Sequence, residues 1–385
     1  MRRGWSPPES LTSTAVLVLF LGAFVMGTTE LVAVGLVPDY AERAGISVEA
    51  AGGAVGFYAL GMFLVGPVLA LATSRIRTKP VMVGACATFV VGCFVAVIPW
   101  APALFAGRLL SGAAQGIFMA STFQMIGATA TPALVGPLVA RVLAGISLAA
   151  AVGLPAGTEI GAQLGVASVT WLSAGAAGLV LLGVLLWTPR AQTEAPLTAS
   201  EELASLRSGG VLLRLLGLVL AFTATFTLVT QMAAFTESRA EGALLVVLIG
   251  FGVGAVAGTF IGGHLAKREG FALPALSLAL LLTLAVLLVV TSTWTLVLCA
   301  ALLALVSFAM IPLTQTYVAA QSPGRLLPAL PASAINGGIT VGSVLAGRSL
   351  AAGEDQLLTT ALAPAAAAAV VMIVVTRKPR KATSA

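Results

Sequence analysis

Long apolar runs alternate along this chain with short polar breaks. Because roughly 20 apolar residues cross the hydrocarbon of a bilayer as a helix, each run predicts one membrane-spanning helix. Prolines stand near several breaks, as is common near helix ends, at Pro102, Pro137 and Pro189. The pattern predicts twelve spans, at residues 13–36, 50–71, 80–99, 102–126, 137–160, 168–188, 211–235, 242–265, 271–291, 294–318, 326–350 and 355–376.

Composition excludes a soluble fold. Of the 385 residues, 59% are hydrophobic and only 9% are charged, and the mean hydropathy is +1.06. Soluble domains carry about a quarter charged residues. The interior of a soluble protein also grows too slowly with size to bury this much apolar surface. We therefore expect an all-α integral membrane protein that is surrounded by the lipid bilayer.

The basic residues indicate the orientation of the chain. The net charge of +6 is interpreted as a topology signal, and no nucleic-acid partner is expected. If the N-terminus is cytoplasmic, only Arg43, Arg239 and Arg348 lie in outer segments, while Arg108 and Arg141 lie within spans. The inner segments then hold the other fifteen, which are Arg2, Arg3, Arg75, Arg77, Lys79, Arg190, Arg207, Arg214, Lys267, Arg268, Arg325, Arg377, Lys378, Arg380 and Lys381. This bias predicts a multi-pass protein of the cytoplasmic membrane with both termini in the cytoplasm.

The first apolar run is expected to stay in the protein. Arg2 and Arg3 before it imitate a signal peptide, but the run exceeds the usual signal core and further spans follow at once. The three cysteines lie inside apolar runs without metal-ligand spacing. His264 is the single histidine. We therefore expect neither a metal nor a cofactor.

A polar stretch divides the chain into two halves of six spans. We expect an N-terminal bundle at 1–188, a cytoplasmic loop at 189–210 and a C-terminal bundle at 211–385. A weak internal repeat supports this division, because Gly66 and Gly258, like Gly145 and Gly337, are 192 residues apart. Paired halves are a common transporter plan, with the substrate held between them near the midplane.

Small residues recur every fourth position in several spans. The longest series are Gly250, Gly254, Gly258 and Gly262 in the eighth span and Gly153, Gly157, Gly161 and Gly165 at the end of the fifth. Such series line one helix face and let two backbones approach closely. They are compatible with static helix packing and with faces that slide during a conformational cycle, and their recurrence every three spans favours sliding.

Four segments resemble motifs of one family. Residues 26–39, MGTTELVAVGLVPD, resemble the first helix of drug:proton antiporters of the major facilitator superfamily, in the chloramphenicol-resistance and arabinose-efflux branch. Residues 107–116 resemble its fourth-helix motif, which is built around an arginine. Residues 145–157, with Gly145, Gly153, Pro155 and Gly157, resemble the fifth-helix motif of antiporters. The resemblance implies the major facilitator fold, two pseudo-symmetric six-helix bundles, and proton-coupled export.

The loop after the second span matches its motif only in part. Residues 66–79, which include Gly66 and Arg75, resemble the loop motif between helices 2 and 3. Ser74 stands where the family usually has an aspartate, and Arg77 where it has a glycine. That aspartate normally pairs with cations and helps to lock one face closed. The resemblance therefore does not extend to the locking salt bridge.

Glu30 and Arg108 are the candidates for proton coupling. Each lies about six residues from the outer end of its span, so both are at similar depth. A lone charge at the middle of a bilayer costs about 2.5–3.5 kcal/mol on insertion scales, and pairing or a water-filled cavity reduces that cost. We interpret Glu30 as a proton carrier facing a central cavity and Arg108 as the cation that tunes it. A static structural ion pair is the alternative.

Five side-chain amides within the spans are candidates for the substrate cavity. Each can hydrogen-bond a substrate or only a neighbouring helix, and both interpretations remain open. They are Gln115, Gln124, Gln231, Gln315 and Asn336.

Transport driven by a gradient is the function that these features favour. The chain has no Gly-x-x-x-x-Gly-Lys-Ser/Thr phosphate loop and no other enzyme signature, so we expect no catalysis and no direct use of ATP. One charge that crosses 100 mV supplies about 2.3 kcal/mol. We expect a monomeric, proton-coupled exporter of small apolar compounds or drugs, with protons and a small-molecule substrate as its partners. The alternatives are a sugar or metabolite carrier of the same fold, and a non-transporting membrane sensor or pore.

Overall fold

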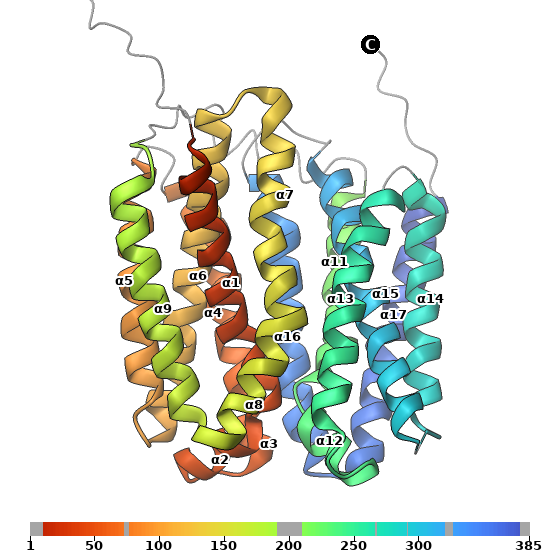
Figure 1. Cartoon of the computed structure of the whole chain (residues 1–385). Coiled ribbons are helices and arrows are strands. Elements are labelled where there is room, and N and C mark those ends of the chain that lie inside the picture. Colours follow the sequence, from red (N-terminus) through yellow and green to blue (C-terminus); the bar gives the residue numbers. More distant parts are fainter. Residues whose placement is uncertain are drawn as a thin grey trace, which may run out of the picture.

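The computed structural model describes residues 11–72, 77–190, 210–265, 268–290, 292–319 and 326–377, and its elements are helices (Figure 1). The N-terminal half comprises α1 (Ser13–Gly35), α2 (Val37–Ala44), α3 (Val48–Ala51), α4 (Gly53–Ala72), α5 (Thr78–Ala96), α6 (Ala101–Thr129), α7 (Pro132–Leu148), the π-helix η2 (Ala149–Gly153), α8 (Leu154–Leu164) and α9 (Val166–Trp187). The C-terminal half comprises α11 (Val211–Val229), α12 (Met232–Arg239), α13 (Leu244–Leu265), α14 (Glu269–Leu287), α15 (Thr293–Ala319), α16 (Leu326–Leu350) and α17 (Glu354–Arg377).

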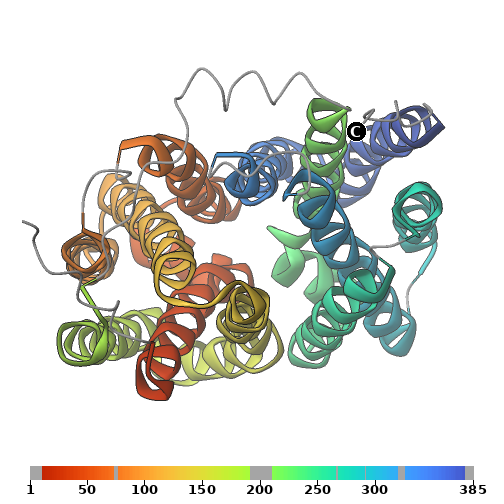
Figure 2. The ribbon, with the colours of Figure 1, turned by 90° about the horizontal axis from the view of Figure 1, so that it is seen from above.

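The long helices are of membrane-spanning length. Among the described residues, ten helices are long and apolar enough to cross a membrane, and the bent pair Val37–Ala44 and Val48–Leu64 raises the number to eleven. α16 has 25 residues and runs the length of the bundle (Figure 1). It packs against α4 and α11. These helices together form the expected twelve-span arrangement in two six-helix bundles, which Figure 2 shows side by side from above.

The helix starts repeat along the chain with the spacing that the glycines indicated. α6 begins at Ala101 and α15 at Thr293, which are 192 residues apart, and α5 and α14 begin at Thr78 and Glu269. In both halves a long first helix is followed by a short one, α2 or α12. These short helices lie at the end of the bundle opposite the start of α1 (Figure 1). We call this end, with residues 37–51 and 232–239, the α2/α12 end.

Three predicted spans differ from the observed helices. The predicted span 211–235 is interrupted at Thr230 and Gln231, where α11 gives way to α12. The predicted span 50–71 is preceded by α3, which the Ser47 side chain caps by accepting from the Ala50 amide at 3.3 Å. The fifth span begins earlier than predicted and contains the π-helix η2. Apolar runs set the number of spans, whereas caps and breaks depend on single polar residues that hydropathy overlooks.

The two halves contact each other near the α2/α12 end. A continuous cluster of buried apolar side chains joins Leu36 and Val55 of the N-terminal half to Met232 and Phe235 of the C-terminal half. α4 packs against α16, and α13 packs against η2 and α8. The Thr340 hydroxyl of α16 lies 3.4 Å from the carbonyl oxygen of Gly56. The helices that contact across the halves are therefore the second with the eleventh span and the fifth with the eighth.

Most of the glycine series serve packing within one half in this structure, and the sliding of these faces stays a prediction. A Cβ at Gly254, Gly258 or Gly262 would collide with backbone carbonyls of α15 in the same half. In the fifth span, Gly153 and Gly157 lie against side chains of α1 and Gly161 against Leu36 directly after it, which is again the same half. Among the described residues, five other glycines make close approaches between the halves, and these are Gly52, Gly56, Gly252, Gly337 and Gly347.

Candidate functional site

Glu30 lies near the end of α1 and is bound by a neutral amide. Its Oε2 accepts a hydrogen bond from Gln115 Nε2 of α6 at 2.7 Å. The Glu30 side chain is only partly buried, whereas Gln115 is 1% exposed. The acid therefore keeps some access to its surroundings while the donor that holds it is enclosed.

Tyr58 of α4 fixes the other end of that amide. Its hydroxyl donates to Gln115 Oε1 at 2.5 Å and also lies 3.2 Å from the carbonyl oxygen of Met26. The tyrosine is fully buried. Because an amide has one donor end and one acceptor end, Tyr58 on the acceptor end leaves the donor end facing Glu30.

Arg108 holds the backbone around the acid. Its Nη1 donates to the carbonyl of Thr29 at 2.6 Å, its Nη2 to that of Glu30 at 3.1 Å, and its Nε to that of Ala54 at 3.0 Å. The guanidinium carbon lies 4.3 Å from the centre of the Tyr58 ring, and the side chain is 2% exposed. Its hydrogen bonds thus go to backbone carbonyls of α1 and α4, while the Glu30 carboxylate accepts from an amide.

Two glycines allow α4 and α6 to approach closely enough for this arrangement. A Cβ at Gly112 would collide with the backbone of Tyr58, and a Cβ at Gly61 would collide with the carbonyl of Leu109. Small residues at such contacts let helix backbones come together in membranes. Tyr58 and Gln115 meet because of this close packing.

The site has no acidic counterpart in the C-terminal half. The first helices of the two halves end 194 residues apart, at Gly35 and Val229, so Ala224 stands at the position of Glu30, and α11 carries no acidic residue. With the spacing of 192 residues between α6 and α15, Ser307 corresponds to Gln115. The Ser307 hydroxyl pairs with that of Thr225 at 2.7 Å. The side chains around Phe222 are aromatic, since its ring centre lies 6.0 Å from that of Phe226 and 5.9 Å from that of Phe308. One half therefore supplies an acid and the other an aromatic group.

The remaining amide candidates do not gather around Glu30. Gln124 and Gln315 lie in the last two turns of α6 and α15, at the end opposite α2 and α12. Asn336 of α16 donates to the Ala332 carbonyl at 2.8 Å. Gln231 lies at the break between α11 and α12, against the other half. Only Gln115 is in contact with the acid.

The fifth-helix motif packs against α1. A Cβ at Gly145 would lie 2.5 Å from the Phe20 carbonyl, and one at Gly157 would lie 2.7 Å from the Val32 side chain. Pro155 is at the start of α8, directly after the π-helix that ends at Gly153. The motif thus sets the contact between the first and fifth spans.

The loop motif is described only at its ends. Gly66 lies in α4, and Arg77 is exposed directly before α5. Ser74 and Arg75 lie outside the described residues.

Sequence reasoning missed Tyr58. Tyrosine in an apolar run is ordinary, and its spacing from Gln115 carries no signal. One indication was available: a buried tyrosine hydroxyl needs a partner, and few polar groups are present in these spans.

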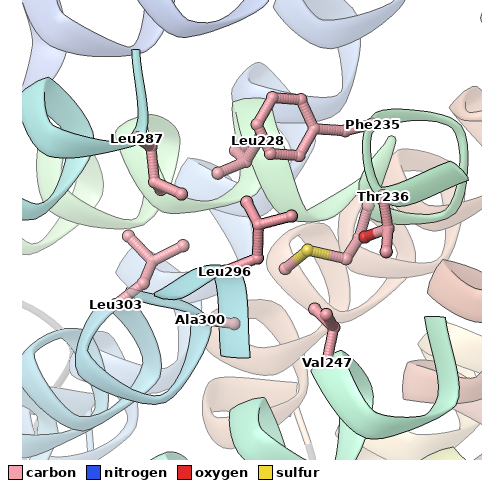
Figure 3. A pocket seen from close by; sticks show the side chains of 9 residues that line it. Leu228, Phe235, Thr236, Val247, Leu287, Leu296, Ala300 and Leu303 are labelled. Carbon is pink, nitrogen blue, oxygen red and sulfur yellow. The ribbon is translucent and has the colours of Figure 1, made fainter. Parts of the chain in front are cut away.

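A cavity near the α2/α12 end is too small for a substrate. It has a volume of about 10 Å³, near the lower limit for one water molecule. Figure 3 shows its apolar lining, with Leu228, Phe235, Leu296 and Leu303 around it. Within the described part of the chain, no group of three His, Cys, Asp or Glu side chains could hold a metal ion.

A bundle of membrane-spanning helices in two repeats, with one acid held among them, defines a polytopic membrane protein of transporter architecture. The chain matches the family model of the Major Facilitator Superfamily over residues 19–347 and therefore belongs to that superfamily.

Relatives in bacteria are named as transporters. The uncharacterized MFS-type transporter YtbD of Bacillus subtilis (strain 168) is 29% identical over 358 residues, which cover 86% of this chain and 87% of that protein. The inner membrane transport protein YdhP of Escherichia coli (strain K12) is 28% identical over 351 residues, covering 88% and 89%. The chloramphenicol resistance protein of Streptomyces lividans is 29% identical over 260 residues, covering 66% of each chain. The family and these relatives support membrane transport rather than catalysis.

Solved structures share the fold. A bacterial homologue of the human lysosomal transporter Spinster has a TM-score of 0.78 at 13% identity, over 99% of this chain and 100% of that one. The human organic anion transporter MFSD10 (TETRAN) has a TM-score of 0.65 at 19% identity, over 93% and 99%.

Proposed function

We propose that this chain exports small, largely apolar compounds, drugs among them, in exchange for protons. The observation that carries the proposal is the environment of Glu30. Its partly buried carboxylate accepts from Gln115, while the three hydrogen bonds of Arg108 go to backbone carbonyls. An acid that a neutral amide holds, with a cation close by, can exchange a proton without breaking a direct ion pair.

The contacts between the halves support a cycle of alternating access. The distribution of Arg and Lys supports cytoplasmic termini, so the α2/α12 end is the outer end in this proposal. Contact of the halves at that end supports the inward-facing state for this structure. The Spinster homologue of similar fold was likewise solved in an inward-facing conformation. Parting of the halves at the α2/α12 end, with closure at the other, gives the outward-facing state.

A cluster of aromatic side chains in the C-terminal half supports an apolar substrate. The Phe222 ring packs near those of Phe226 and Phe308, and the Phe308 ring packs near that of Phe251. The relative named for chloramphenicol resistance adds support for drugs as substrates.

The test is transport by the full-length chain in proteoliposomes, with chloramphenicol and ethidium as probes. We expect an imposed proton gradient to drive accumulation, and a protonophore to abolish it. Glu30→Gln should lose at least about 90% of the gradient-driven rate, because the amide cannot carry a proton in this pH range. Glu237→Gln, at an exposed glutamate of α12, is the matched control and should retain it.

Equal gradient-driven rates in Glu30→Gln and the wild type would refute the assignment of Glu30. Transport that ignores the protonophore would favour a carrier without proton coupling. Labelling of both termini from the outside would refute the proposed orientation.

A further inference from the structure

We propose that Gln115 and Tyr58 form a hydrogen-bond switch that follows the protonation state of Glu30. The Gln115 amide turns over when the carboxylate takes up a proton, and the Tyr58 hydroxyl then changes its acceptor from Gln115 to Met26. The inference rests on the proposed role of Glu30 as a proton carrier. It adds two positioning residues and a mechanical consequence to that role.

The observed arrangement fits the ionised acid. A carboxylate can only accept hydrogen bonds, and Gln115 presents a donor, Nε2, at 2.7 Å from Glu30 Oε2. Gln115 Oε1 in turn accepts from Tyr58 at 2.5 Å. The chain of donors therefore runs in one direction, from Tyr58 through Gln115 to Glu30.

Protonation of Glu30 disturbs this order. The carboxylic acid gains an O–H donor, and the nearest side-chain group it meets is the N–H donor of Gln115. A half-turn of the amide brings Oε1 to the acid and Nε2 to the Tyr58 oxygen. The Tyr58 hydroxyl hydrogen then rotates to the Met26 carbonyl oxygen, which already lies 3.2 Å away.

Tyr58, Gln115 and Glu30 each keep a hydrogen-bond partner within this chain of side chains in both arrangements. Only one covalent change occurs, the formation of the Glu30 O–H bond with a proton from the aqueous side, and Tyr58 keeps its own proton throughout. Tyr58 is fully buried and Gln115 is 1% exposed, so water is a poor substitute for a lost partner. A buried donor or acceptor without a partner is costly, and this cost causes the Gln115 amide to turn over when Glu30 takes up a proton.

The consequence is an added connection between helices. With the acid ionised, the Tyr58 hydroxyl donates to Gln115 and joins α4 to α6; with the acid protonated, Gln115 donates to Tyr58 and keeps that connection, while the Tyr58 hydroxyl donates to Met26, one turn before Glu30, and so also joins α4 to α1. Protonation of one side chain thus changes a contact between helices, and α4 also packs against α16 of the other half.

Few other charges face the acid. Arg108 of α6 is common to both arrangements, because it is bound to backbone carbonyls. The Cys93 thiol of α5 interacts electrostatically with Tyr58 and Arg108. Among the other described helices that pack against α1, α9 and η2 carry no charged residue. The charged side chains of α7, α8 and α12 are at least partly exposed; they are Arg141 on α7, Glu159 on α8, and Glu237 and Arg239 on α12.

Infrared difference spectroscopy of the full-length protein between high and low pH tests the switch without a substrate. The C=O band of the protonated Glu30 is identified by its loss in Glu30→Gln. We expect Gln115→Leu to move this band to higher wavenumber, because the acid O–H loses its acceptor. Tyr58→Phe should move it in the same direction by less, since a hydrogen-bonded chain loses strength when one link is removed.

The titration of the same band gives the size of the effect. Tyr58→Phe should change the proton affinity of Glu30 by about fivefold, the equivalent of one hydrogen bond. The double variant should titrate like Gln115→Leu alone, because Tyr58 acts only through Gln115. Tyr40→Phe is the matched control; it removes a buried hydroxyl that bonds Thr170, and it should leave the band unchanged.

The outcomes separate the switch from the proposed function. If Glu30→Gln removes no titrating band, Glu30 is not a proton carrier and the proposed function fails. If the band is present but Tyr58→Phe matches Tyr40→Phe, the switch is refuted. A double variant that adds the full Tyr58→Phe shift to that of Gln115→Leu also refutes it. Should Gln115→Leu not fold, the comparison of the two tyrosine variants decides alone.

Discussion

Gly52 of the N-terminal half lies directly against the side-chain amide of Gln231 in the C-terminal half. A methyl group at Gly52 would collide with the amide nitrogen and lie 3.2 Å from the Thr230 side chain. Gln231 is fully buried, and neither its oxygen nor its nitrogen has a hydrogen-bond partner. The contact between the halves thus requires that Gly52 has no side chain, and it buries the amide of Gln231 without a hydrogen-bond partner. Substitutions at these two residues should bias the contact in opposite directions.

Gly52→Ala should weaken the contact at the α2/α12 end. Gly52 has helical backbone angles, so alanine causes no backbone strain, and the effect comes from the collision with Gln231. Overpacking of this kind costs about 1–3 kcal/mol. Spin labels at the exposed Glu42 of α2 and Glu237 of α12 can report the separation of the halves, because double electron–electron resonance measures the distance between the two labels. The population with the short distance should fall; an unchanged distribution would contradict the prediction.

Gln231→Met should strengthen the same contact. Methionine has similar length and needs no partner, so the cost of burying an unpaired amide, about 1–3 kcal/mol, disappears. The population with the short distance between the same labels should rise. Thr225→Val is the matched control, because it replaces a buried polar group of α11 that is paired with Ser307 in the same half. A larger response to Thr225→Val than to Gln231→Met would contradict the argument.

Hydropathy was sufficient for the fold because lipid exposure affects every residue of a span. The number of spans follows from the apolar runs. The break at Gln231 could not be predicted from them, because one polar residue hardly changes the hydropathy averaged over the length of a span. The spacing of the glycines predicted close helix contacts correctly. It did not indicate the partner, because Gly252 faces the other half while Gly254, two residues later, faces α15. Partner choice depends on the helix rotation, which the sequence pattern leaves open.

The sequence allowed a prediction of how deep Glu30 and Arg108 lie in the membrane, but not of the hydrogen bonds that surround them. Glu30 and Arg108 could be placed at similar depth from their distances to the span ends. That Arg108 binds the carbonyls of Thr29 and Ala54 could not be predicted, because any residue presents the same carbonyl. Two arginines at the α2/α12 end show the same limit. Arg43 donates to the Val97 carbonyl and Arg239 to those of Leu287 and Val290, so these exceptions to the charge bias bind carbonyls at the ends of α5 and α14.

Arg108→Lys should destabilise the protein although it keeps the charge. A guanidinium can donate in several directions from a rigid plane, whereas one ammonium cannot reach the three carbonyls on α1 and α4 together. Loss of hydrogen bonds from a buried charged group should cost about 2 kcal/mol or more. Thermal unfolding in detergent measures the loss. Arg141→Lys, at an exposed arginine of α7, is the control and should change the free energy of unfolding by no more than about 0.5 kcal/mol.

A buried ion pair in the C-terminal half gives the last prediction. Arg214 Nη2 of α11 lies 3.2 Å from Glu269 Oε1 of α14, and the guanidinium carbon lies 3.6 Å from the centre of the Tyr317 ring of α15. Removing one partner leaves the other charge buried, which costs about 3–5 kcal/mol, whereas replacing both with apolar side chains of similar size is often neutral. Arg214→Met and Glu269→Leu should therefore each lower the thermal midpoint strongly, and the double variant should recover most of the loss. The three variants and the wild type form a double-mutant cycle in one detergent. Additive losses would show that the two side chains stabilise the fold independently, through their packing, and would contradict the ion pair as the source of their effect.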